Sequence, residues 1–376
     1  MASSLNDKLK NVKWGVFKLG DLFEISTPKK RFDANKVNIL KSGVYPYIVR
    51  TGSCNGQKGF INESEDYLNE GNTISFGQDT ATMFYQGKPY FTGDKIKILT
   101  AKFDGFNKYN AWFFMSSMKK GFYSFSWGTS SFSVDIIKEQ KLNLPVTNDG
   151  LIDFGFINYF VAELGAERIA ELEVYLAVAG LKDYNLIQNE QQALDIYNDL
   201  IFDEFKIVDV FDIKNTANIL SSDVKENSGN TPYLCASSEN NGVKTYISYD
   251  KKYLEKGNCI FIGGKTFVVS YQENDFYSND SHNLILYLRN KSARNKFVQF
   301  FLSSCINKSL GGKYSWGDSV SYKKIQDDRF LLPTRGNNPD FSYMSDLISA
   351  IQKLVIKDVV RYTEKKMSAY KHVVAR

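Results

Sequence analysis

The stretch FINYFVAELGAERIAELEVYLAVAGLKD, at residues 156–183, decides the architecture of this chain. It contains no proline, and apolar or small residues recur along it every three or four positions or a multiple of that spacing, at Val161, Leu164, Leu172, Tyr175 and Ala179. This spacing predicts an amphipathic helix. At 1.5 Å per residue the helix would extend roughly 40 Å. Gly180 and Asn185 stand where a chain commonly leaves such a helix.

The sequence before this stretch recurs after it. Residues 17–25 (FKLGDLFEI) match residues 205–213 (FKIVDVFDI), and residues 68–80 (LNEGNTISFGQDT) match residues 254–266 (LEKGNCIFIGGKT). The tripeptide Ser-Trp-Gly at residues 126–128 returns at residues 315–317. Because the offset between matching segments stays nearly constant, we interpret the two halves as an internal duplication.

Residues 343–373 repeat the organising helix. Their apolar stripe consists of Met344, Ile348, Ile351, Val355, Val359 and Tyr362. Residues 155–184 carry five acidic and two basic side chains, whereas residues 342–376 carry seven basic and three acidic ones. Opposite charge beside an apolar seam favours pairing, so we expect the two helices to form an antiparallel coiled coil. The alternative is that each helix packs on its own unit.

Each copy of the repeat is predicted to be mixed α/β. Strands are expected at residues 45–49, 73–76 and 95–99, where aromatic and β-branched residues alternate with polar ones. Helices are expected at residues 107–119 and 295–307. The fold class is therefore α/β (mixed α+β), with two tandem domains and a pseudo-two-fold repeat. The predicted boundaries are residues 1–150, 151–188 (first helix), 189–340 and 341–376 (second helix).

Composition is that of an ordinary globular protein, with 43% hydrophobic and 24% charged residues and a formal charge of +5. No apolar run has the length needed to span a bilayer. The four cysteines are scattered and there are only two histidines, so neither a zinc site nor a disulfide framework is expected. These features predict a reduced, cytoplasmic protein without a membrane partner.

Further short segments add to the pattern of repeated units and long helices. Examples are YPYIVRTGS at residues 45–53, GDKIKIL at residues 93–99, SFSVDIIKEQKLNLPV at residues 131–146 and AELEVYLAVAGLKDYNL at residues 170–186. With the opening FKLGDLFEI and the tandem layout, their order resembles that of specificity subunits of Type I restriction–modification systems, or of their Type IIB counterparts. The resemblance covers nearly the whole chain.

The resemblance implies two target-recognition domains, each reading one half of a split DNA site. It implies that the helices act as a spacer and as a dock for DNA methyltransferase subunits. The chain would be a non-catalytic subunit whose partners are double-stranded DNA, methyltransferase subunits and endonuclease or translocase subunits. It would hold no cofactor or metal, because S-adenosylmethionine, ATP and magnesium would be bound by the partner subunits.

Candidate DNA-contacting residues are polar or basic side chains in the turns of each unit, where they suit base edges and phosphates. In the first unit they are Arg50, Thr51, Ser53, Asn55, Gln57, Lys58, Gln78, Thr80, Thr129 and Ser130. In the second unit they are Ser237, Ser238, Asn240, Asn241, Lys244, Lys265, Thr266, Lys313, Tyr314 and Ser319. Any of them could instead be an ordinary polar turn residue. Trp127 and Trp316 belong to the repeated framework and are expected to be core anchors, not base-stacking platforms.

Two rival functions remain open from the residues alone. Asp340, Glu364 and Lys366 formally match the pattern of a magnesium-dependent nuclease. That pattern requires its Glu and Lys side by side on a strand, whereas here both fall in a helical pattern, in which residues i and i+2 do not face each other. The other rival is a tandem module that binds a ligand other than DNA, for example a carbohydrate.

Overall fold

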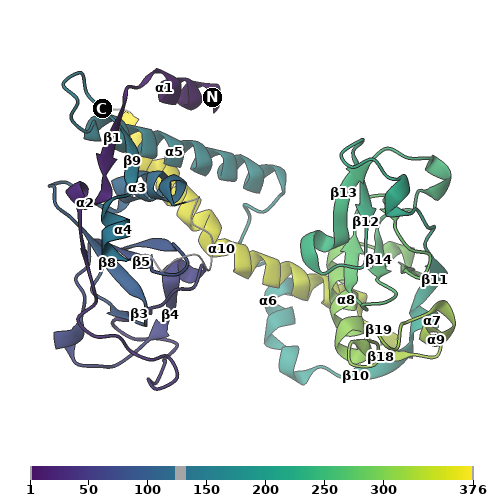
Figure 1. Ribbon diagram of the computed structural model, residues 1–376. Coiled ribbons are helices and arrows are strands. Elements are labelled where there is room, and N and C mark those ends of the chain that lie inside the picture. Colours follow the sequence, from purple (N-terminus) through teal and green to yellow (C-terminus); the bar gives the residue numbers. More distant parts are fainter. Residues whose placement is uncertain (1, 123–132, 375–376) are drawn as a thin grey trace. The chain divides into compact units, whose positions relative to one another are not determined.

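The computed structural model describes residues 2–122 and 133–374. The chain forms two compact units, the first comprising Met1–Val174 and Lys365–Arg376 and the second Tyr175–Glu364. Each unit combines helices with antiparallel and mixed sheets (Figure 1). The predicted mixed α/β class with tandem units is therefore confirmed. Within the described residues, the search for a helix with the length and hydropathy of a membrane span found none.

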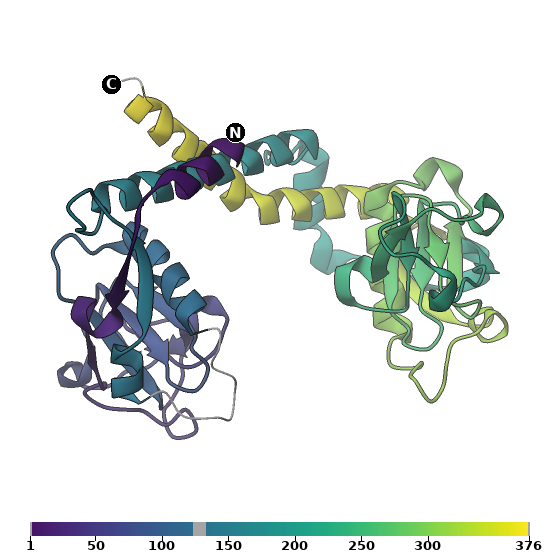
Figure 2. The ribbon, with the colours of Figure 1, turned by 45° about the horizontal axis from the view of Figure 1, so that its top comes forward.

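The first unit contains the elements that precede and include the first long helix. Its helices are α1 (Ala2–Asn11), α2 (Leu19–Leu22), α3 (Lys108–Gly121), α4 (Val134–Lys138) and α5 (Phe154–Val178). Its strands are β1 (Trp14–Lys18), β2 (Phe23–Ser26), β3 (Pro46–Ile48), β4 (Gln57–Phe60), β5 (Thr73–Gly77), β6 (Met83–Gln86), β7 (Phe91–Thr92), β8 (Ile96–Ala101) and β9 (Lys141–Pro145). In Figure 2, α1 runs beside α5, where Lys8 Nζ donates a hydrogen bond to the Tyr159 hydroxyl.

The second unit repeats these elements. Its helices are α6 (Gln188–Asp195), α7 (Ile207–Val210), α8 (Lys296–Leu310), α9 (Tyr322–Ile325) and most of α10 (Phe341–Val374). Its strands are β10 (Phe202–Lys206), β11 (Phe211–Asn215), β12 (Thr231–Leu234), β13 (Val243–Ile247), β14 (Cys259–Ile262), β15 (Val269–Gln272), β16 (Tyr277–Ser278), β17 (Leu284–Leu288), β18 (Arg329–Arg335) and β19 (Asn338–Pro339).

The sheets of the two units correspond strand by strand. The first unit has an antiparallel sheet of order β2-β8-β5-β6 and a mixed sheet of order β4-β3-β7, and the second has β11-β17-β14-β15 and β13-β12-β16. Even the register is kept: Tyr47 pairs with Phe91 in parallel in the first unit, and Tyr233 pairs with Tyr277 in the second. The duplication predicted from the sequence is thus present in the topology.

A helix and its asparagine cap recur at the same place in each unit. Asn107 accepts hydrogen bonds from the first backbone N–H groups of α3, and Asn295 does the same for α8. Such caps satisfy donors that the helix itself leaves free. The helix α3 packs against β9 and β6, and α8 packs against β15 and β18. Buried aromatic and aliphatic side chains fill the space between helix and sheet in both units.

The helix α5 ends at Val178, five residues before the predicted end at Asp183. Gly180 has a φ of +66°, and the Leu181 N–H donates to the Leu176 carbonyl at 2.8 Å. This left-handed glycine cap stops the helix. Tyr175, predicted to lie on the apolar stripe, is exposed, whereas the adjacent Leu176 is buried.

The buried face of α10 differs from the predicted stripe. Met344 is buried and Ile348 is partly buried, as expected, but Ile351, Val355, Val359 and Tyr362 are exposed. The buried positions in this part of α10 are Ala350, Val360 and Thr363. The stripe read from the sequence therefore leaves an apolar surface on α10. Its pairing with α5 stays a prediction.

A buried ion pair fastens α6 to α10 inside the second unit. The Glu190 carboxylate, with 4% of its side chain exposed, accepts hydrogen bonds from Ser349 Oγ at 2.6 Å and Lys353 Nζ at 2.9 Å. It also accepts from the Ile187 N–H at 2.9 Å. Burial acts to raise the pKa of Glu190, but these hydrogen bonds and the Lys353 charge outweigh it and lower that pKa.

Candidate DNA interface

The turns that carry the predicted site residues follow the edges of the β4-β3-β7 sheet and its repeat. In the first unit, Cys54, Asn55 and Gly56 all have positive φ values of 49°, 55° and 76°. In the second unit, Asn240, Asn241 and Gly242 repeat this conformation with 47°, 52° and 79°. Asparagine and glycine tolerate this region of backbone space better than other residues, which explains why Asn-Gly recurs here.

The asparagines in these turns have framework roles. Asn55 Nδ2 donates to the Tyr85 carbonyl at 3.2 Å, and Asn241 Nδ2 donates to the Tyr271 carbonyl at 3.0 Å. Each side chain ties its turn to the neighbouring strand, β6 or β15. Asn240 likewise donates to the Val243 carbonyl at 3.0 Å. Direct DNA contact by these three residues stays a prediction, whereas their role in shaping the turn is visible in the structure.

Four of the predicted residues of the first unit line one cleft. Arg50, Thr51, Lys58 and Thr80 surround a volume of about 760 Å³, together with Arg31, which sequence reasoning missed. Arg31 lies in the extended chain between β2 and β3 and forms an exposed ion pair with Asp94 at 3.4 Å. No sequence pattern indicates Arg31, because the residues around it belong to no repeated segment. Three cationic side chains therefore converge on this cleft.

Among the residues that the structure describes, the remaining predicted residues of the first unit are not part of the cleft lining. Ser53 is exposed, and its hydroxyl lies 3.0 Å from that of Thr51. Gln57 and Gln78 are half-buried, and the Gln78 N–H donates to the Lys95 carbonyl at 2.8 Å. Thr129 and Ser130, like Trp127, fall outside the residues that the structure describes.

In the second unit the predicted residues form two neighbouring groups. Thr266 Oγ1 donates to the Ala236 carbonyl at 3.0 Å, which brings the β14–β15 turn next to the segment of Ser237 and Ser238. Lys265 projects from the same turn with 58% of its side chain exposed. Lys244 is exposed on β13, within 3.9 Å of a Glu226 carboxylate oxygen.

One predicted site residue in the turn after α8 lies in the core and not on the surface. Tyr314 was predicted to face DNA, but it is 5% exposed, stacks on Phe267 at 5.0 Å and donates its hydroxyl proton to Asp328. Its side chain is therefore part of the core, and burial beside Asp328 raises its pKa. Lys313 also forms an ion pair with the buried Asp328, although half of its side chain remains exposed. Ser319 is half-buried, and its carbonyl accepts from Lys324 Nζ at 3.0 Å.

Trp316 is a second correction. It was expected to anchor the core, but 80% of it is exposed. It stands at the tip of a four-residue turn closed by mutual backbone hydrogen bonds of Ser315 and Asp318, at 3.2 and 3.1 Å. Lys324 Nζ pairs with the Asp318 carboxylate and fastens the turn. In the second unit, the tryptophan of the repeated tripeptide is thus exposed on the surface and not buried in the core.

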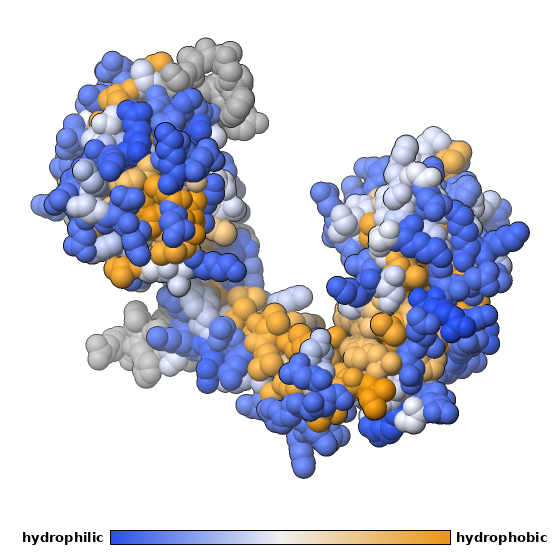
Figure 3. Space-filling model, turned by 90° about the horizontal axis from the view of Figure 1, so that it is seen from below, coloured by the Kyte–Doolittle hydropathy of each residue, from blue (hydrophilic) through white to orange (hydrophobic). Residues whose placement is uncertain are grey.

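Much of the surface in view is hydrophilic. Figure 3 shows hydrophilic residues over most of the visible face of each globular part, with apolar patches between them. Among residues 2–122 and 133–374, no group of three or more His, Cys, Asp or Glu side chains could hold a metal ion. Asp340 accepts the Tyr343 N–H at 3.0 Å at the start of α10. Glu364 lies 24 residues further along the same helix, about 36 Å away. Asp340 and Glu364 therefore cannot share one nuclease site, and that alternative is wrong.

Two copies of one mixed α/β unit, each presenting polar and basic turns beside the same sheet, define a tandem recognition protein. The model of the Type I restriction modification DNA specificity domain matches residues 11–174 and 201–361, and the chain belongs to this family. It is a DNA sequence-specificity subunit of a restriction–modification system. The alternative of a module for a ligand other than DNA is thereby set aside.

Similar proteins match nearly the whole length of this chain. The chain is 25% identical over 361 residues to the Type II restriction enzyme BgcI specificity subunit S.BcgI of Heyndrickxia coagulans, covering 94% of this chain and 98% of that protein. Its fold is similar to the crystal structure of a Type-I restriction-modification system S subunit from M. genitalium, with a TM-score of 0.60 at 14% identity. That match covers 96% of this chain and 94% of the other.

Proposed function

We propose that each unit reads one half of a bipartite DNA site. The observation that carries this proposal is the repetition of one fold with different side chains at equivalent turns. Gly77-Gln78-Asp79 of the first unit is replaced by Gly263-Gly264-Lys265 in the second, at the same point of the same sheet. Two copies of one fold that carry different side chains at equivalent turns would recognise different half-sites.

The long helices α5 and α10 would set the distance between the half-sites. They would also dock the methyltransferase subunits, for which the exposed apolar residues Ile351, Leu354 and Val355 on α10 are suited. The recognition domains would span residues 1–150 and 189–340, and the helical segments residues 151–188 and 341–376. A coiled coil of α5 with α10 would fix this spacing.

The chain would contribute recognition and no chemistry. Methylation and cleavage would belong to methyltransferase and endonuclease or translocase subunits in the cytoplasm. S-adenosylmethionine, ATP and magnesium would be bound by those subunits and not by this chain. Both a Type I arrangement and a Type IIB-like arrangement with a fused methyltransferase–nuclease are compatible with this division.

Selection from randomised double-stranded DNA tests the proposal. The full-length chain, alone and with its methyltransferase, would be used to capture duplexes, which are then sequenced. We expect two short, unlike half-sites in inverted orientation, separated by base pairs that are not read. Half-site centres about one helical turn apart, some 34–36 Å, would match a spacer of this length. Enrichment of one continuous motif, or no enrichment with either preparation, would overturn the proposal.

A further inference from the structure

Three segments of the first unit bring their charges together at the edge of the cleft. Arg50 follows β3, Asp79 lies in the turn between β5 and β6, and Lys95 precedes β8. An Arg50 guanidinium nitrogen lies 2.6 Å from Asp79 Oδ2, and Lys95 Nζ lies 2.8 Å from the same oxygen. The side chain of Asp79 is 19% exposed, that of Arg50 35% and that of Lys95 48%. One half-buried carboxylate therefore holds two cations that remain accessible.

The second unit places different groups at the same three points. Arg50 lies three residues after Tyr47 and Ala236 three residues after Tyr233, and these tyrosines occupy equivalent registers. Asp79 and Lys265 each stand two residues after the glycine at the end of the central strand.

The position of Lys95 also has an equivalent in the second unit. Phe76 pairs with Lys97 in the first unit and Ile262 pairs with Leu284 in the second, so Lys95 corresponds to His282.

The charges are rearranged at these points. In the second unit the turn carries the cation Lys265, and the carboxylate comes from Asp280, which precedes β17. His282 Nδ1 lies 2.7 Å from Asp280 Oδ1, and Lys265 Nζ lies 4.0 Å from Asp280 Oδ2. At the position that corresponds to Arg50, the second unit has Ala236 and therefore no arginine. The two clusters thus share a place in the fold but present opposite charges on the turn.

The fold itself does not require the cluster of the first unit. The second unit builds the same strands in the same register with Ala236 and Lys265 in place of Arg50 and Asp79. What the cluster does provide is a fixed arginine on the wall of the cleft, beside Thr51 and Thr80.

A fixed arginine suits one base. The planar guanidinium matches the O6 and N7 acceptors that guanine presents in the major groove, whereas lysine offers a single point charge. We propose that Arg50 reads a guanine of the first half-site and that Asp79 is a positioning residue that orients it. Lys95 neutralises the remaining charge of Asp79. This inference rests on the proposed function, and it specifies guanine as a base that the first unit recognises.

The test uses full-length variants and the DNA half-site found by selection. Arg50→Ala, Arg50→Lys and Asp79→Asn would be compared with wild type on duplexes that differ at each base pair. We expect Arg50→Ala and Arg50→Lys to lose discrimination for guanine at one position by roughly ten-fold or more. Asp79→Asn should relax the same position, and the Arg50→Ala/Asp79→Asn double variant should be no worse than Arg50→Ala alone.

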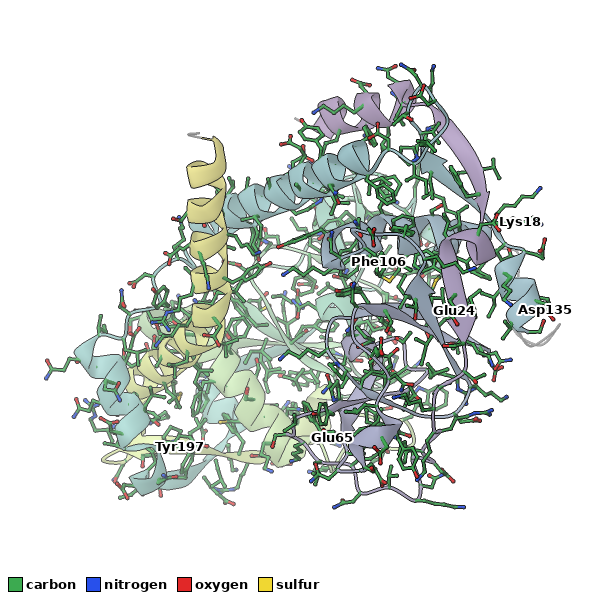
Figure 4. All side chains as sticks on the ribbon, turned by 90° about the vertical axis from the view of Figure 1, so that its left-hand side faces the viewer. Lys18, Glu24, Glu65, Phe106, Asp135 and Tyr197 are labelled. Atoms are coloured by element: carbon green, nitrogen blue, oxygen red, sulfur yellow. The ribbon has the colours of Figure 1, made fainter. Side chains whose placement is uncertain are left out.

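A matched control breaks another ion pair of the same unit. Lys18 pairs with Glu139 at 2.9 Å, and Figure 4 shows Lys18 projecting outward from β1. Glu139→Gln should leave every base preference unchanged. The second half-site should be unchanged in all variants.

Two results would overturn the inference. One is an Arg50→Lys variant that keeps full discrimination, since the planar guanidinium would then not be what reads the base. The other is equal discrimination in wild type and Arg50→Ala, since that would make the cluster structural. In both cases the bipartite motif itself survives, which separates failure of this inference from failure of the proposed function.

Discussion

The buried pair of Glu190 and Lys353 gives a quantitative test of how the second unit is held together. We expect Glu190→Gln to leave the Lys353 ammonium, whose side chain is 14% exposed, without its buried partner and with only the exposed Asp183 carboxylate, 3.8 Å away. Removing one partner of a buried pair costs about 3–5 kcal/mol of unfolding free energy. The lower end, about 3 kcal/mol, applies because Lys353 keeps a hydrogen bond to the Asn185 carbonyl at 2.9 Å.

Scanning calorimetry of the full-length chain would measure this loss. For a unit of this size, about 3 kcal/mol corresponds to a fall of roughly 6–12 °C in the Tm of its transition. Glu204→Gln is the matched control, because Glu204 is 63% exposed and lies 3.9 Å from Arg329. The control should change the unfolding free energy by less than about 0.5 kcal/mol. Equal shifts in both variants would refute the reasoning.

The same pair predicts a dependence on pH. The folded pKa of Glu190 is held below its ordinary value, so its contribution to stability is fully present above the unfolded pKa of about 4.3. That contribution is lost as pH falls through the folded pKa. The difference in Tm between wild type and Glu190→Gln should therefore be largest near neutral pH and should shrink below about pH 4. A difference that grew on acidification would contradict the assignment.

Four further predictions concern DNA and partner binding. Replacing Ile351 and Val355 together with Asp should abolish co-purification with the methyltransferase, because charge would be buried without a partner; unchanged capture would argue against docking on α10. Lys58→Ala should weaken binding to all sequences and lower the salt slope by about one. An altered base preference with an unchanged slope would contradict a phosphate contact. Inserting four residues after Gly165, with a matching insertion in α10, should lengthen the gap by roughly 6 Å, or about two base pairs, and leave both half-sites unchanged. Methylome sequencing would detect this, and an unchanged gap would mean that the helices are not the spacer. Trp316→Ala should change the unfolding free energy by less than about 0.5 kcal/mol, since the side chain is exposed. A loss of about 3–5 kcal/mol in a denaturant titration would instead indicate a core residue.

The turn residues show where sequence reasoning stopped. Tyr314 carries a group that suits DNA, and it was predicted to face it. In the structure, Tyr314 is buried against Phe267. Side-chain type indicates which contacts are possible, but burial depends on which distant segment packs on the residue. Sequence spacing carries no information on that packing.

The repeated unit, its mixed α/β class and the helices α3 and α8 can be predicted from the sequence. These follow from local properties: the alternation of apolar residues, the asparagine caps and matching segments at a constant offset. The tertiary structure alone decided which face of α10 is buried and that Trp316 is exposed. It alone also joined Arg50 and Lys95 through Asp79. The physical reason is that burial and ion pairing depend on distances between atoms, and three segments far apart along the chain become neighbours only when the sheets form.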